Sequence, residues 1–233
     1  HLISRMSKNM KILLIEEPIN YNPEEGSTAD LMVINDNLHV LQPKVRDIES
    51  IAEILPHYIK SKTVSIGWFY SASFTPLLSA LKFDVVIYDC MDELSLFKGA
   101  PKYLISQEKY LMSHADIVFT GGKSLYESKK QMHPNVYCFP SSVDEAHFAK
   151  AQNGIKIPSD VADLKSPIVG YFGVIDERID LQLLHETAQL LPNVSFVMIG
   201  PLAKIEDADL PKESNIHYLG MRSYNELPNY LKA

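Results

Sequence analysis

The sequence DVVIYDCMDELSLFKGAPKYLISQEKYLMSHADIVFTGG, residues 84–122, decides the fold class of this protein. Residues 84–90 and 116–122 are two apolar, β-branched runs. Between them, residues 101–115 place apolar side chains three and four positions apart, which is the period of an amphipathic helix. A strand, a helix and a second strand in this order predict a βαβ unit, whose two strands run parallel with the helix on one face of the sheet.

The same alternation continues on both sides of this unit. It predicts strands over residues 11–17, 38–43, 63–69 and 136–142, and helices over residues 47–61, 73–82 and 123–132. The near-continuous apolarity of these strands indicates burial on both faces, as in a parallel sheet covered by helices. We therefore predict an α/β domain over residues 1–145.

A second α/β domain is predicted over residues 166–233. Residues 146–165 are rich in small, polar and turn residues, which is typical of an interdomain linker. The pattern beyond them predicts three strands, over 167–175, 195–200 and 216–220, and a helix over 181–192. Because three strands are few for a sheet with two buried faces, we expect this second domain to be incomplete or to pack against the first domain.

The composition favours some classes of protein for this chain and argues against others. The 233 residues are 46% hydrophobic and 22% charged, which is typical of a soluble globular protein, and the formal net charge of −7 argues against a nucleic-acid surface. Cys90 and Cys138 lack CxxC spacing and the histidines are not clustered, so we predict no disulfide, no metal site and two reduced, buried thiols in the cytoplasm. No apolar run reaches the roughly 18 to 20 residues of a membrane-spanning helix, although a local basic face could still contact anionic lipid as a peripheral protein.

Acidic residues follow the strand predicted over 84–90. Ligands of open parallel sheets bind beyond the carboxyl ends of the strands, and carboxylates there orient hydroxyl groups or accept protons. Of Asp89, Asp92 and Glu93, we expect Asp92 to point into a cleft, and it is the candidate catalytic residue. The alternative is structural, because acids at the start of a helix cap it and interact favourably with its dipole.

Two glycines follow the next strand. Gly121 and Gly122, with Lys123 behind them, would let backbone N–H groups approach an anion at the positive end of a helix. Since neither GxGxxG nor GxxxxGKS/T is present, the alternative that the glycines only make a tight turn stays open. Ser142, at the exit from the last predicted strand of the first domain, is a further candidate binding residue.

The sequence GYFGVIDERID, residues 170–180, places acids and an arginine after a strand. Arg178 is the only cation in this stretch, and a guanidinium at the start of a helix can bind a diphosphate with two parallel hydrogen bonds. The alternative is a surface salt bridge to Glu177 or Asp180. Asp180 precedes an apolar helical run and is a candidate helix cap.

Four segments, taken together, resemble a known enzyme family. YDCMDE (88–93), TGGKSLYE (120–127), FPSSVD (139–144) and GVIDERID (173–180) are similar in order and spacing to a bacterial subfamily of retaining GT-B glycosyltransferases, the GT4-like glycosyl transferases group 1. The resemblance covers essentially the whole chain. It implies two Rossmann-like domains with parallel sheets, the second incomplete, in which the first domain mainly binds the acceptor and the second mainly binds the nucleotide sugar.

The resemblance also implies a reaction and its residues. A sugar would pass from a nucleotide-diphosphate sugar, with a UDP-sugar expected, to a glycan, polysaccharide or lipid-linked acceptor, without an obligatory cofactor. Asp92 would serve on the acceptor side, and the proton acceptor would be the leaving phosphate itself. The donor and its phosphates would be held by a set of glycine, serine and arginine residues, namely Gly173, Arg178, Gly200, Gly121, Gly122 and Ser142. Glu177 stands where relatives more often carry a lysine.

The resemblance further predicts truncation at both ends. Residues 1–6 are similar to the end of the first helix, and the segment that holds the sugar and ribose of the donor would lie beyond Ala233. Met91 takes a place where many relatives have a histidine. We therefore expect the 233 residues alone to have little or no transfer activity.

Two alternatives stay open at this point. A nucleotide-sugar epimerase of similar shape would need paired acid and base carboxylates in one cleft, for which Asp92 and Glu108 are the candidates. A non-catalytic α/β module that binds a glycan or a protein would need neither.

Overall fold

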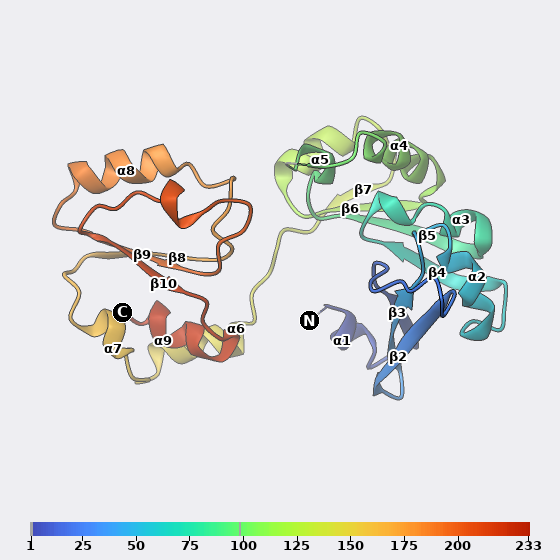
Figure 1. The fold of residues 1–233 in the computed structure, drawn as a ribbon, viewed down its shortest axis with the longest axis horizontal. Coiled ribbons are helices and arrows are strands. Elements are labelled where there is room, and N and C mark those ends of the chain that lie inside the picture. Colours follow the sequence, from blue (N-terminus) through green and yellow to red (C-terminus); the bar gives the residue numbers. More distant parts are fainter. Residues whose placement is uncertain (1, 98) are drawn as a thin grey trace. The chain divides into compact units, whose positions relative to one another are not determined.

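A computed structural model describes residues 2–97 and 99–233. The chain divides into two compact units, one ending at Ser141 and one running from Ser142 to Ala233. Each unit has its own sheets and its own hydrophobic core (Figure 1). Within the described ranges, no helix is long and apolar enough to cross a lipid bilayer.

The larger sheet of unit 1 is the one predicted from residues 84–122. It contains β4 (Thr63–Phe69), β5 (Lys82–Cys90), β6 (Ile117–Thr120) and β7 (Val136–Cys138), which lie in that order and are all parallel. Helix α4 (Leu104–His114) connects β5 to β6 and buries Leu111 and Met112. The last five residues of β5 are buried, which accounts for the continuous apolar run in the sequence.

A smaller, mixed sheet completes unit 1. Strand β1 (Ile12–Ile15) runs parallel to β3 (Leu38–Lys44), and β2 (Thr28–Asn35) pairs with β3 in the antiparallel direction. The sequence pattern did not predict β2, because seven of its eight residues are exposed and burial leaves no periodic pattern there. The Asn35 side chain closes the hairpin by accepting the backbone N–H groups of Asn37 and Leu38. The hairpin therefore adds one antiparallel pair to the parallel sheets predicted from the sequence.

The remaining helices of unit 1 are short. The single helix predicted over 47–61 is α2 (Ile51–Ile54) followed by a 3-10 turn at Leu55–His57, where Pro56 has no N–H group to continue an α-helical ladder. The other helical segments of the unit are α1 (Leu2–Met6), η2 (Ala72–Phe74), α3 (Leu77–Ala80), η3 (Leu94–Leu96) and α5 (Lys123–Lys129). One buried cluster joins residues of both sheets, including Leu41, Val86 and Val118, so the two sheets share a core.

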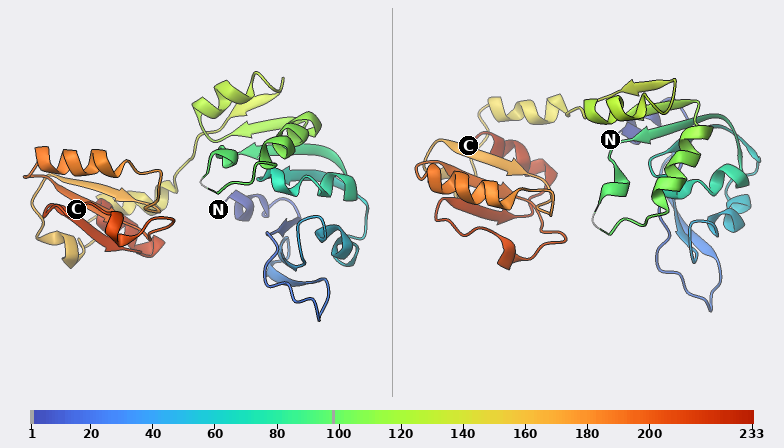
Figure 2. Two further views of the ribbon diagram at one scale, coloured as in Figure 1. Left: turned by 45° about the horizontal axis from the view of Figure 1, so that its top comes forward. Right: turned by 90° about the horizontal axis from the view of Figure 1, so that it is seen from above.

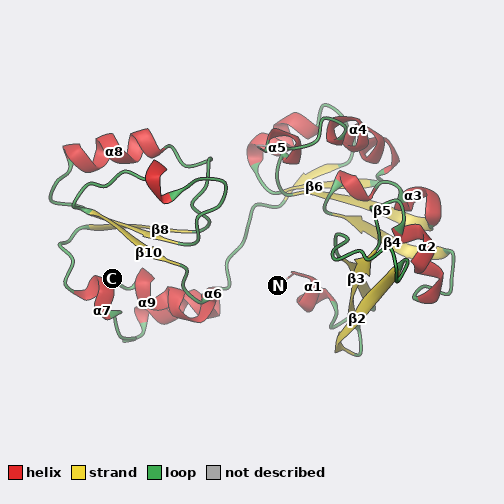
Figure 3. Ribbon diagram, in the orientation of Figure 1, coloured by secondary structure: helices red, strands yellow, loops and turns green. Residues whose placement is uncertain are grey.

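Unit 2 is a three-layer α/β unit. Its parallel sheet has the order β10 (Ile216–Gly220), β9 (Ser195–Ile199), β8 (Ile168–Phe172), and every residue of β9 is buried. Phe196 and Met198 pack in one cluster with α8 (Leu181–Leu190), and Val197 and Ile199 pack in a second cluster. Helix α8 covers one face of the sheet, while α7 (Ser159–Ala162) and α9 (Leu227–Leu231) cover the other (Figures 2 and 3).

The linker predicted over residues 146–165 is part of unit 2. This segment contains most of α6 (Glu145–Phe148), the 3-10 turn η4 (Ala149–Gln152) and α7. Val161 of α7 is 2% exposed and belongs to the cluster around Val197. Its helices are only four residues long, too short to show an apolar period, which is why composition suggested a linker. The two other 3-10 turns of unit 2 are η5 (Asp207–Asp209) and η6 (Tyr224–Glu226).

Candidate functional site

The carboxyl ends of β8 and β9 approach each other closely at two glycines. Gly173 follows β8 and Gly200 follows β9, and a Cβ atom on Gly200 would lie 1.7 Å from the carbonyl oxygen of Gly173. No side chain fits at position 200, so the two strand ends stay in backbone contact. The contact continues beyond the strands, where Ile175 forms a parallel bridge with Leu202.

An acid and an arginine, Asp176 and Arg178, lie just after β8 and pair with each other. Nε of Arg178 donates to both carboxylate oxygens of Asp176 at 3.1 and 3.0 Å, and Nη2 donates to Oδ2 at 2.8 Å. The Arg178 guanidinium thereby lowers the pKa of Asp176. Arg178 forms a salt bridge with Asp176, a residue that differs from the two partners considered in the alternative, Glu177 and Asp180. The Arg178 side chain remains 55% exposed, whereas that of Asp176 is 10% exposed.

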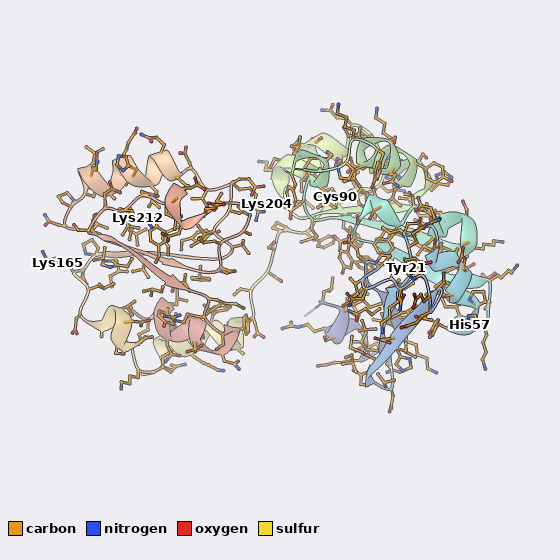
Figure 4. The ribbon with its side chains drawn as sticks, in the orientation of Figure 1. Tyr21, His57, Cys90, Lys165, Lys204 and Lys212 are labelled. Atoms are coloured by element: carbon orange, nitrogen blue, oxygen red, sulfur yellow. The ribbon has the colours of Figure 1, made fainter. Side chains whose placement is uncertain are left out.

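A second cation, from outside residues 170–180, joins this group. Lys204 lies in the loop after β9 (Figure 4), and its Nζ atom is 3.2 Å from Oε1 of Glu177. The pairing of β8 with β9 brings it there from 27 positions away in the sequence. The other oxygen of Glu177, Oε2, is buried and has no hydrogen-bond partner among the described residues. We call Asp176, Glu177, Arg178 and Lys204 the strand-end cluster of unit 2.

Asp180 has the capping role expected of it. Its carboxylate accepts the backbone N–H group of Leu183 at 2.9 Å, so Asp180 is the N-cap of α8. Asp180 therefore stabilises the helix that follows the strand-end cluster and is not a ligand candidate.

The acids after β5 in unit 1 have different surroundings. Asp89 is 4% exposed and accepts a hydrogen bond from the indole N–H of Trp68 at 3.1 Å, and burial raises the pKa of its carboxyl group. Asp92 is exposed, and its carboxylate forms no hydrogen bond or ion pair with another described residue. Asp89 is therefore a structural residue, and of the two Asp92 is the one that solvent and ligands can reach.

The two glycines after β6 differ: one makes a tight turn, and the other leaves space at the start of a helix. A Cβ atom on Gly121 would lie 2.8 Å from the carbonyl oxygen of Met91, so this position needs glycine to let the β5 and β6 ends approach. Gly122 is the N-cap of α5, and a Cβ atom there would meet nothing within 4 Å. Gly121 therefore makes a close turn, while Gly122 leaves space at the start of α5.

A buried ionic network lies behind the β5 end. The Lys129 side chain, 3% exposed, contacts Glu93 at 2.9 Å and Glu108 at 2.8 Å, and the Tyr88 hydroxyl donates to Glu108 at 2.7 Å. Glu108 is thus held by a cation and a hydroxyl group, whereas Asp92 is exposed. The paired acid and base carboxylates that an epimerase would need are not assembled from these two residues.

The two thiols are both free, as expected from the sequence. Cys90 is buried, and burial raises its pKa to about 11. Cys138 is half-buried, so the expectation of full burial is wrong for it. Ser142 lies in an exposed loop at the first position of unit 2, outside any helix or strand.

A pocket of about 910 Å³ lies at the strand ends of unit 1. Glu17 after β1, Arg46 and Asp47 after β3, and Ser71 after β4 line it together with residues from the 94–107 segment. Oε1 of Gln107, which also lines the pocket, is buried without a hydrogen-bond partner in the described chain. We call this the polar pocket of unit 1. Asp92 does not line it, although Leu94 and Phe97 do.

Sequence reasoning missed the residues of the polar pocket. Glu17 is the last residue of one predicted strand, and Arg46 and Ser71 lie within three residues of the ends of two others. These positions were a usable signal, because ligands bind at the carboxyl ends of parallel strands.

Comparison with solved structures identifies the architecture. A trehalose-phosphate synthase from Burkholderia xenovorans, crystallised with glucose-6-phosphate, superposes with a TM-score of 0.60 over 98% of this chain and 72% of its own, at 9% sequence identity. HepE of Anabaena, in complex with UDP and glucose, superposes with a TM-score of 0.56 over 78% of this chain and 52% of its own, at 15% identity. This chain has the GT-B fold. The resemblance to GT-B glycosyltransferases seen in the sequence is confirmed at the level of the fold.

One curated relative is similar in sequence. TuaH of Bacillus subtilis, named as a glycosyltransferase of teichuronic acid biosynthesis, is 24% identical over an alignment of 183 residues, which covers 71% of this chain and 45% of TuaH. No family model matches the sequence. The GT-B chain thus spans about half the length of this relative and of HepE.

Proposed function

We propose that this chain is part of a retaining glycosyltransferase, which moves a sugar from a nucleotide-diphosphate sugar to a glycan, polysaccharide or lipid-linked acceptor. The observation that carries the proposal is the GT-B fold, found together with sequence similarity to a protein named as a glycosyltransferase. HepE shares this fold and was crystallised with UDP and with UDP-glucose, which supports a UDP-sugar as the donor.

The strand-end cluster of unit 2 supports a diphosphate site. Arg178 and Lys204 have side chains that are 55% and 45% exposed, so both cations can reach a ligand while bound to their acidic partners. Gly173 and Gly200 themselves carry no side chain that would block an approaching phosphate. Departure of the diphosphate creates negative charge, and cations already in place would stabilise it.

The buried Oε2 atom of Glu177 needs a hydrogen-bond donor at this site. A carboxylate oxygen without a donor is costly when it is buried, and a ligand hydroxyl group would supply the missing hydrogen bond. The proposed donor contains such hydroxyl groups on its ribose and its sugar. Glu177 therefore takes part in donor binding in this proposal, in place of the lysine that relatives more often have.

The polar pocket of unit 1 is the proposed acceptor site. It combines carboxylates, serine hydroxyls and an unpaired amide oxygen with the apolar side chains of Ile48, Pro101 and Leu104, a mixture that suits the polar edges and apolar faces of a sugar ring. Asp92 stays in the proposal as the catalytic residue, and Gly121, Gly122 and Ser142 stay in it as donor-binding residues. No side-chain nucleophile is assigned, and the leaving phosphate takes the proton of the acceptor hydroxyl. A cytoplasmic location and peripheral contact with a membrane, where a lipid-linked acceptor would lie, belong to the same proposal.

The donor site can be tested on the chain itself. Backbone amide spectra recorded during a titration with UDP should show shifts at residues 173–178 and 200–204. Each charge-assisted hydrogen bond is worth about 1.5 to 3 kcal/mol, so Arg178→Ala or Lys204→Ala should weaken UDP binding about ten- to a hundredfold. Lys212→Ala is the matched control, because Lys212 is an exposed lysine of unit 2 that pairs with Asp207 outside the strand-end cluster.

Sugar transfer itself needs a separate assay. Full-length protein given a radiolabelled UDP-sugar and a glycan acceptor should yield a lengthened glycan, whereas an epimerase would yield an epimerised nucleotide sugar. Absence of UDP binding by both the chain and the full-length protein would remove the enzyme proposal and leave a non-catalytic binding module.

A further inference from the structure

The strand-end cluster of unit 2 contains as many acids as cations. The guanidinium of Arg178 is bound to Asp176, and the ammonium of Lys204 is bound to Glu177. At neutral pH the four side chains together have no formal net charge. A phosphate site made of cations alone attracts an anion more strongly as the charge of the anion grows. The acids of this cluster oppose that attraction, so they affect which anions bind.

Both acids keep their charge at neutral pH. The Arg178 guanidinium lowers the pKa of Asp176. A backbone hydrogen bond lowers the pKa of Glu177, and Lys204 lowers it further. Carboxyl groups with lowered pKa values are ionised at pH 7. An approaching anion therefore meets two carboxylates and not two neutral acids.

Several hydrogen bonds hold Asp176 against its cation. The Asp176 carboxylate accepts hydrogen bonds from Nε of Arg178 at 3.1 and 3.0 Å, from Nη2 at 2.8 Å and from the Arg178 backbone N–H at 3.1 Å. An anion that binds the exposed side of the guanidinium lies about 6 Å from this carboxylate, the length of two hydrogen bonds in line. The anion is therefore attracted by Arg178 and repelled by Asp176 at the same time.

The repulsion grows with the negative charge of the ligand. At about 6 Å and an effective dielectric constant of about 40 to 80, each additional ligand charge near one carboxylate weakens binding about three- to tenfold. UDP-glucose carries one negative charge on each phosphate. Free UDP carries an additional charge on its terminal phosphate, because the second ionisation of a phosphate monoester has a pKa of about 6. UDP-glucuronate carries its additional charge on the sugar.

We propose that Asp176 and Glu177 determine the charge specificity of the donor site: they favour a nucleotide-diphosphate sugar whose sugar is uncharged and disfavour ligands with an additional negative charge. The Oε2 atom of Glu177, unpaired among the described residues, acts in the same direction, because a sugar hydroxyl group can donate a hydrogen bond to it and a carboxylate cannot. The product UDP is more highly charged than the donor, so the same acids favour its release. This inference rests on the proposed function, since it concerns the ligands of the donor site.

The experiment measures dissociation constants by calorimetry on the 233-residue chain, for UDP-glucose, UDP and UDP-glucuronate at neutral pH and one salt concentration. Glu177→Gln removes the charge and keeps the shape of the side chain. We expect it to strengthen binding of UDP and of UDP-glucuronate about three- to tenfold more than binding of UDP-glucose. Asp176→Asn, in the other pair, should change the same ratios in the same direction. Asp207→Asn is the matched control and should leave all three constants unchanged, because Asp207 is an exposed acid that pairs with Lys212 outside the cluster.

The ratio of two dissociation constants of one variant decides the outcome, because a loss of folded protein does not change that ratio. Equal weakening of all three ligands in both variants would show that the acids only orient their cations, and it would overturn the proposal, as would ratios equal to those of the parent chain. In either case Arg178→Ala would still weaken UDP binding if the proposed function is right. A parent chain that binds none of the three ligands would instead contradict the proposed function, and the charge specificity with it.

Discussion

Replacing Lys129 with methionine tests the buried ionic network of unit 1 directly. Methionine keeps much of the length of the side chain and removes the charge. Burial alone would lower the pKa of Lys129, but hydrogen bonds to Glu108 and Glu93 outweigh burial and raise it. The ammonium group is therefore charged in the folded protein, and both carboxylates depend on it. K129M leaves two partly buried acids, with side chains 14% and 26% exposed, close together without a cation.

The expected loss of unfolding free energy follows from the burial of this ion pair. Removing one partner of a buried ion pair costs about 3 to 5 kcal/mol, because the remaining charge is left uncompensated. With a urea dependence of about 2 kcal/mol/M, the unfolding midpoint of unit 1 should fall by about 1.5 to 2.5 M. Lys130→Met is the matched control. Lys130 is the neighbouring residue, pairs with Glu127 and is 41% exposed, so its loss should leave the midpoint unchanged.

The assay can follow unit 1 alone. The sequence has a single tryptophan, Trp68, which lies in β4 and donates to the buried Asp89. Urea unfolding followed by Trp68 fluorescence therefore reports unit 1 without a contribution from unit 2. Equal midpoints for K129M and K130M would refute the reasoning, since they would show that the buried lysine adds no more stability than an exposed one.

The same variant makes a pH prediction with a defined sign. The folded-state pKa of Lys129 is raised, so its charged form contributes stability that is fully present below the unfolded pKa of about 10.4 and is lost as the pH rises through the folded value. The stability difference between the parent chain and K129M should therefore shrink as the pH is raised above about 10.

Two further changes test unit 2. Gly200→Ala would place a Cβ atom 1.7 Å from the Gly173 carbonyl oxygen, so we expect a loss of at least about 1 to 3 kcal/mol in thermal unfolding followed by circular dichroism, while Gly170→Ala, with open space at its Cβ position, should have little effect. The pKa of Asp176 lies below its ordinary value because of Arg178, so this pair stabilises the fold above the unfolded pKa of about 3.9 and loses that effect as the pH falls through the lowered value. NMR titration of the carboxyl group should give a higher pKa in R178A than in the parent chain, and an unchanged value would mean that the pair does not persist in solution.

Much of the α/β framework could be predicted from the sequence. Strands β5 and β9 were placed correctly because burial on both faces of a parallel sheet requires a contiguous apolar run, and that run is visible in the sequence. Strands β4, β6 and β8 were also placed from their apolar runs, although four of the five residues of β8 are exposed. Strand β2 and the four-residue helices of unit 2 escaped prediction for the opposite reason. Exposed strands and single helical turns impose no periodic pattern on the residues that form them.

Only part of the candidate site could be predicted from the sequence. Arg178 was predicted as a binding residue because it follows a predicted strand, a relation that is local in the sequence, whereas Gly173 and Gly200 were predicted from the family resemblance. By itself, then, the sequence determined which segments become strands and which polar residues stand at their ends. The tertiary structure alone decided that Lys204 meets Glu177 across 27 positions and that Lys129 meets Glu93 across 36. Such partners depend on strand order and packing, because side chains distant in sequence interact only after the sheet has brought their strands together.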